Sequence, residues 1–200
     1  MREIITITQI TLDGIMQAPG GPDEDRAGGF SQGGWAMPLV DDALSRVIDE
    51  IIANDFDMLL GRRTYQIFAA YWPHQGDDRI AKAFNRAKKY VVTRHRDHLD
   101  WENSQPITGD VVNKIRRLKT IDGPAIHVWG SSELLQTLIP AELIDEYRLW
   151  VFPVVLGEGK RLFEDGVPPF GLSLVQSAST AQGVLINTYR SADAVKTTSA

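Results

Sequence analysis

Apolar and polar positions alternate along the chain in blocks that indicate strands and helices. Residues 4–12 are rich in isoleucine and threonine and place apolar side chains on both parities, which is typical of a strand covered on both faces or of one with a bulge. Residues 39–54 repeat apolar side chains at helical spacing and carry charges on the opposite face. We expect a central strand at 4–12 and an amphipathic helix at 39–54 packed on a sheet.

Other blocks complete the expected order of elements. The apolar patterns predict further strands at 56–60, 90–92, 143–155, 171–178 and 184–190, the last two forming a hairpin. Helices are predicted at 79–87 and from Gly109 to about Leu118. Residues 101–106 look irregular, and the tail from Ser191 looks frayed.

Residues 18–34 form a long stretch dominated by glycine and proline without a period of its own. Such a loop is often a lid or a binding loop, and the alternative is a surface insertion. Trp35 closes the stretch and would place a flat side chain beside a site. In the helix that follows, Asp41, Asp42 and Asp49 could include a catalytic acid, but we favour acidic residues that complement the helix dipole.

Residues 126–135 are the most informative segment of the chain. A short apolar run ends at Gly130, Ser131 and Ser132 follow, and an apolar pattern at helical spacing then runs to Pro140, so a strand feeds a helix. A helix begins with unpaired N–H groups and a partial positive charge, which favour phosphate. We interpret this turn as a diphosphate site. The alternative is an ordinary turn in which Gly130 relieves a clash and a serine caps the helix.

Two more strand ends carry polar or basic residues. The strand at 56–60 leads directly into Gly61-Arg62-Arg63-Thr64, where the arginines can fork onto phosphate oxygens and Thr64 either caps the next helix or binds phosphate. Thr93 and Arg94 follow the strand at 90–92, at the end where parallel sheets bind ligands. We predict that the three junctions converge on one groove that a pyridine dinucleotide can occupy.

Composition narrows the class of protein. The 200 residues fit one domain, 1–200, and a net charge of −5 argues against general nucleic-acid binding. The absence of cysteine excludes disulfides, thiolate zinc sites and cysteine nucleophiles. Neither a signal-peptide core nor an apolar stretch of membrane length is found, so we expect a cytoplasmic protein. We interpret His95 and His98 as exposed loop residues, and no metal is implied.

Several common motifs fail. Gly159-Lys160 suggests a phosphate loop, but the required earlier glycine is Val154 and the required hydroxyl residue is Arg161. The patterns G-x-G-x-x-G, G-x-S-x-G and H-E-x-x-H are missing. Hydrolase and metalloenzyme hypotheses therefore have no support.

Three segments in this order and spacing, 59–65, 90–94 and 126–133, resemble the dihydrofolate reductase-like superfamily. The nearest branch contains the reductase domain of bifunctional riboflavin biosynthesis deaminase-reductases, and residues 11–14 and 155–163 also look like that branch. The resemblance implies a three-layer α/β/α fold with a mostly parallel central sheet, a C-terminal antiparallel hairpin, and NADPH along the carboxyl ends of the strands.

The resemblance also implies roles for individual residues. Cofactor phosphates and ribose would be bound by Gly61, Arg62, Arg63, Thr64, Thr93, Arg94, Gly130, Ser131, Ser132 and Glu133. The reaction site would be lined by Asp13 as the candidate catalytic residue, by Ile15 beside the cofactor, and by Gly14, Met16 and Trp35 beside the substrate. Asp13 could equally only shape its turn.

The expected function is an NADPH-dependent reductase that transfers hydride to a small polar heterocycle or ribosylaminopyrimidine-like substrate bound between residues 13–35 and the first helix. One alternative is dihydrofolate reductase activity, but the acidic pterin-binding position of that enzyme falls on Ser45, with Asp41 or Asp49 one turn away. The other is a non-catalytic nucleotide-binding dimeric module. Relatives often pair subunits through the late strands and the turn at 157–163, so a homodimer is expected.

Overall fold

The blocks of β-branched residues form strands of a single sheet. The computed structural model describes residues 1–94 and 98–192. The strands in these ranges are β1 (Ile4–Thr11), β2 (Phe56–Gly61), β3 (Lys89–Val92), β4 (Ser104–Ile107), β5 (Ala125–Trp129), β6 (Glu146–Phe152), β7 (Gly171–Ser179) and β8 (Leu185–Ala192). Their order in the sheet is β4-β3-β2-β5-β1-β6-β8-β7. The first six of that row are parallel, and β8 runs antiparallel to both β6 and β7.

Strand β1 lies inside the sheet, between β5 and β6, with Ile4 opposite Ile126 and Thr11 opposite Phe152. Its isoleucines serve two hydrophobic cores: Ile4 belongs to one cluster, and Ile5 and Ile7 belong to another. The prediction of a central strand covered on both faces is therefore confirmed, and the two parities reflect two cores.

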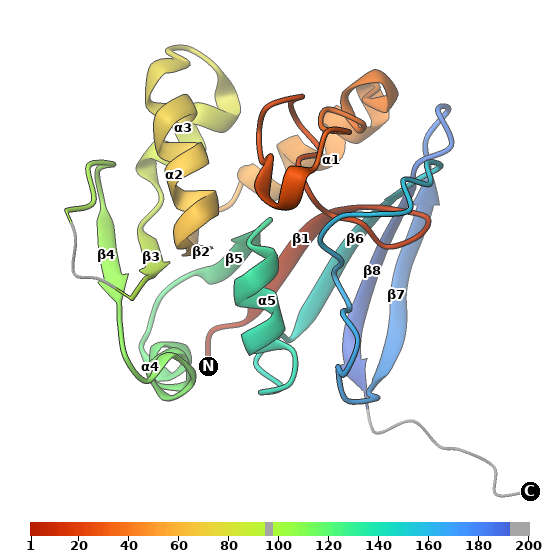
Figure 1. Ribbon diagram of the computed structural model, residues 1–200. Helices are drawn as coiled ribbons and strands as arrows, with labels where there is room; N and C mark the ends of the chain where they lie inside the picture. Colours follow the sequence, from red (N-terminus) through yellow and green to blue (C-terminus); the bar gives the residue numbers. More distant parts are fainter. Residues whose placement is uncertain (95–97, 193–200) are drawn as a thin grey trace, which may run out of the picture.

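Helices cover both faces of the sheet (Figure 1). They are α1 (Asp42–Ile52), α2 (Arg62–Tyr71), α3 (Arg79–Arg86), α4 (Val111–Thr120) and α5 (Ser132–Leu138), with single 3₁₀ turns at η1 (Ala27–Gly29), η2 (Met37–Leu39) and η3 (Trp72–His74). Apolar residues of α4 and α5 pack into one core, and those of α1, α2 and α3 pack into the cores of the other face. The three-layer α/β/α prediction is confirmed, as is the antiparallel hairpin of β7 and β8.

Some element boundaries differ from the prediction. Helix α1 begins at Asp42 because the carboxylate of Asp41 accepts the N–H of Leu44 and caps it. Residues 101–106, expected to be irregular, contribute to β4. The predicted strand 143–155 is shorter in the structure, where β6 spans Glu146–Phe152 and the side chain of the preceding Asp145 accepts the Ile4 N–H. Residues 193–200 of the predicted frayed tail, and His95, lie outside the described residues.

No helix within the described ranges is long and apolar enough to cross a membrane.

Candidate functional site

The three polar junctions lie side by side at the carboxyl edge of the sheet. Strands β3, β2 and β5 are neighbours, and Gly61 at the end of β2 is opposite Val92, the residue before Thr93. The Gly61 N–H donates to the Ser131 hydroxyl oxygen at 3.0 Å, which joins the β2–α2 and β5–α5 junctions directly. The structure thus brings together the segments that the sequence predicted to converge.

Two of the predicted phosphate-binding residues, Ser131 and Thr64, hold these junctions together. Gly130 and Ser131 both have left-handed backbone angles, with φ of 54° and 61°. The Ser131 N–H donates to the Thr64 hydroxyl at 3.0 Å, and the Ser131 hydroxyl donates to the Trp129 carbonyl at 3.0 Å. Ser131 is the N-cap residue of α5, but its side chain makes no capping hydrogen bond, and the N-cap of α2 is Gly61, not Thr64. Capping by these two hydroxyls is therefore wrong, and phosphate binding by them stays a prediction. A β-carbon on Gly130 would lie 3.5 Å from the Thr64 methyl.

The same edge carries three guanidinium groups. Arg62 lies over the ring of Tyr65, 5.8 Å from its centroid, and Arg63 extends to Asp25, with 3.5 Å between its Nε and a carboxylate oxygen. Arg94 is exposed just beyond β3, next to the buried Thr93, whose N–H donates to the Ile107 carbonyl. These permanently charged guanidinium groups, from two neighbouring junctions, can each bind phosphate oxygens, so they suit a ligand that carries several phosphates.

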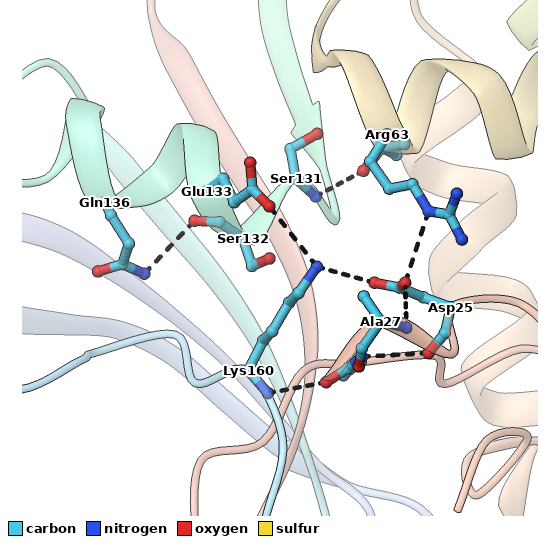
Figure 2. A network of polar contacts seen from close by, with 10 residues as sticks. Asp25, Ala27, Arg63, Ser131, Ser132, Glu133, Gln136 and Lys160 are labelled. Atoms are coloured by element: carbon cyan, nitrogen blue, oxygen red, sulfur yellow. Dashed lines mark hydrogen bonds and ion pairs between the residues drawn. The ribbon is translucent and has the colours of Figure 1, made fainter. Parts of the chain in front are cut away.

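A polar network spans from this edge to two loops (Figure 2). The Lys160 ammonium lies 3.0 Å from Asp25 and 3.8 Å from Glu133, which stands in the first turn of α5. Asp25 also accepts the Ala27 N–H at 3.1 Å. Burial alone would raise the pKa of Asp25, but the hydrogen bonds from Lys160 and Ala27, with the charges of Lys160 and Arg63, hold this pKa below its usual value of 3.8. Glu133 itself is exposed, and the Ser132 carbonyl accepts the Gln136 amide at 3.4 Å.

Sequence reasoning missed Asp25 and Lys160. Lys160 is positioned because residues 14–16 pair with 160–162: the Met16 N–H donates to the Lys160 carbonyl and the Leu162 N–H donates to the Gly14 carbonyl. Gly159 makes this approach possible, since a β-carbon there would lie 2.8 Å from Ile15. The signals for Lys160 in the sequence are the glycine beside it and its place in the 155–163 segment that carries the family resemblance, and neither indicates a pairing with Asp25.

Asp13 is engaged in holding its turn. Its carboxylate accepts the Thr11 hydroxyl at 2.5 Å, the Gly157 N–H at 2.7 Å and the Leu156 N–H at 3.3 Å. The Thr11 hydrogen bond is the main reason that the pKa of Asp13 lies below its usual value, which favours the ionised form. These contacts support the turn interpretation, and the catalytic role of Asp13 stays a prediction.

The space expected for the substrate, between residues 13–35 and α1, is filled by side chains. Ile15, Trp35 and Leu44 belong to one buried cluster, and Met16 is also buried. The Trp35 indole N–H donates to the Gln17 carbonyl at 2.8 Å. A cavity of about 320 Å³ instead lies between this segment and the 157–164 loop, lined by Gln17, Ala27, Gly28, Phe30, Glu158, Gly159, Lys160 and Glu164. Open space therefore adjoins the loops, next to Lys160.

The described ranges contain no group of three or more histidine or acidic side chains that could hold a metal ion. His98 is exposed and contacts Asp100.

A mostly parallel sheet with helices on both faces, an antiparallel strand between β6 and β7, and polar junctions at one edge defines the dihydrofolate reductase-like class of folds. The chain belongs to the RibD C-terminal domain family, whose sequence profile matches residues 2–186. It is 28% identical over 188 residues to the uncharacterized protein YyaP of Bacillus subtilis strain 168, covering 92% of each chain.

Three solved structures share the fold at lower identity. One is a protein of Shewanella sp. PV-4 provisionally named for riboflavin biosynthesis, with a TM-score of 0.66, 18% identity, and coverage of 96% of this chain and 99% of that chain. Dihydrofolate reductase of Enterococcus faecalis, complexed with NADP(H), has a TM-score of 0.61, 15% identity, and coverage of 96% and 97%. A diaminohydroxyphosphoribosylaminopyrimidine deaminase/5-amino-6-(5-phosphoribosylamino)uracil reductase of Thermotoga maritima has a TM-score of 0.61, 14% identity, and coverage of 96% and 57%.

Proposed function

We propose that the protein is an NADPH-dependent reductase whose substrate is a small polar heterocycle of the ribosylaminopyrimidine type. The observation that carries the proposal is the meeting of the β2–α2 and β5–α5 junctions through Gly61, Ser131 and Thr64, with arginines of α2 and of the β3 end at the same edge. Family membership and the NADP(H) and uracil-reductase relatives support it. NADPH would supply the hydride.

The residues of this chain would bind and orient the two reactants. Arg62, Arg63 and Arg94 suit the cofactor phosphates, because a guanidinium forms paired, charge-assisted hydrogen bonds with phosphate oxygens. The backbone around Gly130 and Ser132 would approach the diphosphate. The cavity beside Gln17 and Lys160 adjoins this edge through the Lys160–Glu133 pair, and it is large enough for part of a small substrate.

Folate reduction is disfavoured by the carboxylates of α1. Asp41 caps the helix, and Asp49 pairs with Arg79 on the surface, where both side chains are about half exposed (47% and 50%). Ser45 holds the position that the resemblance assigns to the pterin-binding acid. Asp41 and Asp49, the carboxylates one turn from that position, are therefore both already engaged by other groups of the protein.

The test is a turnover assay with the purified protein. NADPH oxidation is followed by the loss of its fluorescence against a panel that contains a ribosylaminopyrimidine, its 5′-phosphate and dihydrofolate. We expect oxidation with a ribosylaminopyrimidine and none with dihydrofolate. Tight NADPH binding without turnover across the panel would favour the non-catalytic nucleotide-binding module, and the absence of NADPH binding would refute both.

We also propose that the protein is a homodimer that pairs through the late strands. Strand β7 ends the sheet, so one side of it has no neighbouring strand within the described residues, and Leu174 and Val175 are 58% and 57% exposed. The register shift in β7 falls at Val175. Sedimentation velocity should show a dimer that Val175→Glu dissociates and that Ile121→Glu, at another exposed apolar residue, does not. A monomeric wild-type protein would refute the proposal.

A further inference from the structure

Asp25 is a buried carboxylate held between two cations from different parts of the chain. Its side chain is 11% exposed, and its two oxygens are shared: Oδ1 lies 3.5 Å from the Arg63 Nε and Oδ2 lies 3.0 Å from the Lys160 Nζ. Arg63 belongs to the first turn of α2, and Lys160 belongs to the 157–164 loop. Figure 2 shows Lys160 between Asp25 and Glu133, with Arg63 on the far side of the Asp25 carboxylate.

The two cations approach the same carboxylate and would repel each other without an anion between them, although the Arg63 side chain is 54% exposed and solvent screens part of this repulsion. Lys160 is 23% exposed at its side chain, whereas Glu133, its second partner, is 86% exposed and 3.8 Å away. The buried Asp25 therefore supplies most of the compensating charge. An anion that replaced it would meet the same two donors.

A phosphate group matches these donors better than a carboxylate does. Its oxygens are spaced much like those of a carboxylate, it carries more charge, and guanidinium and ammonium groups are its usual partners in proteins. The location is suitable, because Arg63 lies at the β2–α2 junction and Lys160 lines the adjoining cavity. We propose that Arg63 and Lys160 form a phosphate-binding site and that the Asp25 carboxylate occupies this site until a ligand phosphate displaces it.

The rest of the loop can keep its position when Asp25 leaves. The Gln17 side chain donates to the Asp25 and Ala27 carbonyls at 3.1 and 3.0 Å and accepts the Lys160 N–H at 3.0 Å. The backbone of the loop is thus fastened by Gln17 independently of the Asp25 carboxylate. Displacement needs a change at one side chain, not unfolding of residues 18–34.

The ligand phosphate can come from two sources, the diphosphate of a dinucleotide or the phosphate of a phosphorylated substrate. The inference rests on the proposed function for the identity of the ligand, but the site can be tested without turnover. Isothermal titration of the whole protein at low salt would use inorganic pyrophosphate, NADPH and ribose 5-phosphate as separate probes.

Asp25→Asn removes the internal anion and keeps the shape of the side chain. We expect it to bind pyrophosphate about tenfold more tightly, the scale of one charge-assisted hydrogen bond. The matched control is Asp23→Asn, which makes the same charge change in the same loop at a residue paired with the exposed Arg26. The control should bind pyrophosphate within about twofold of wild type. Tighter binding of NADPH would identify a dinucleotide site, and tighter binding of ribose 5-phosphate would identify a substrate site.

Unchanged or weaker pyrophosphate binding by a folded Asp25→Asn protein would overturn the proposal and leave Asp25 a structural ion-pair residue. If that variant does not fold, Lys160→Gln decides: about tenfold weaker pyrophosphate binding supports the site, and unchanged binding overturns it. Failure of the proposed function would give a different experimental result. A protein that binds pyrophosphate as expected but oxidises no NADPH refutes the reductase proposal alone.

Discussion

Replacement of Arg94 by alanine is expected to weaken NADPH binding by roughly 10- to 100-fold and to leave NADH binding nearly unchanged. The reason is that only NADPH carries a 2′-phosphate, and the loss of a charge-assisted hydrogen bond to it costs about 1.5–3 kcal/mol. Arg94 is exposed, so its truncation should not disturb the core. Titration of both cofactors, followed by their fluorescence, measures the effect.

The control for Arg94→Ala is Arg86→Ala. Arg86 ends α3 near the amino end of β3 and pairs with Asp55, with both side chains exposed, so it lies at the opposite edge of the sheet. This variant removes the same charge and should bind NADPH like the wild type. An Arg94→Ala protein that loses NADPH and NADH affinity equally would place Arg94 away from the 2′-phosphate.

Acidification is expected to destabilise the protein through His127. His127 is 5% exposed, and its ring stacks on that of Phe56 with 4.5 Å between the ring centroids. Burial, and secondarily the charge of Arg148, lowers the pKa of His127 to about 3, whereas in the unfolded chain it is 6.5. Between these pH values the unfolded state binds more protons than the folded state. The free energy of unfolding therefore falls as pH decreases from 6.5 towards 3, by about 3 kcal/mol at pH 4.

The variant that isolates this effect is His127→Phe, which keeps an aromatic ring against Phe56. The His127 Nδ1 has no hydrogen-bond partner among the described residues, so the phenyl ring need not break a bond there. Urea unfolding at pH 7 and pH 4 should show a smaller loss of stability in His127→Phe than in the wild type. His98→Phe, at an exposed histidine, should behave as the wild type does. If His127→Phe and the wild type lose equal stability between pH 7 and pH 4, the acid destabilisation comes from groups other than His127.

The fold was largely predictable because its signals are local. Strand, glycine and helix follow one another at Gly61 and at Gly130, and the parallel neighbours then place these turns at one edge. Strand β4 was missed because Pro106 cannot donate a hydrogen bond and so suggests an irregular segment. It is tolerated because β4 ends the sheet, where one side of the strand needs no partner.

The candidate site was predictable only in part. The sequence predicts which strand–helix junctions form the site. The hydrogen bonds from Gly61 to Ser131 and from Ser131 to Thr64 depend on the tertiary arrangement of these junctions, which the sequence does not show. The Asp25–Lys160 pair joins residues 135 positions apart, each in a loop without periodicity. The packing of Trp35 into the core likewise came from tertiary contacts, because an aromatic residue after a glycine-rich loop suits a pocket wall and a core equally well.

The position of β1 has a consequence during synthesis of the chain. This strand is synthesised well before its partners β5 and β6, which begin only at Ala125 and Glu146. Strand β1 therefore remains unpaired until β5 and β6 have left the ribosome. Pairing between strands so far apart in the sequence is also slow to form. A nascent chain of this protein thus exposes the apolar β1 segment, to which chaperones could bind until β5 and β6 are available.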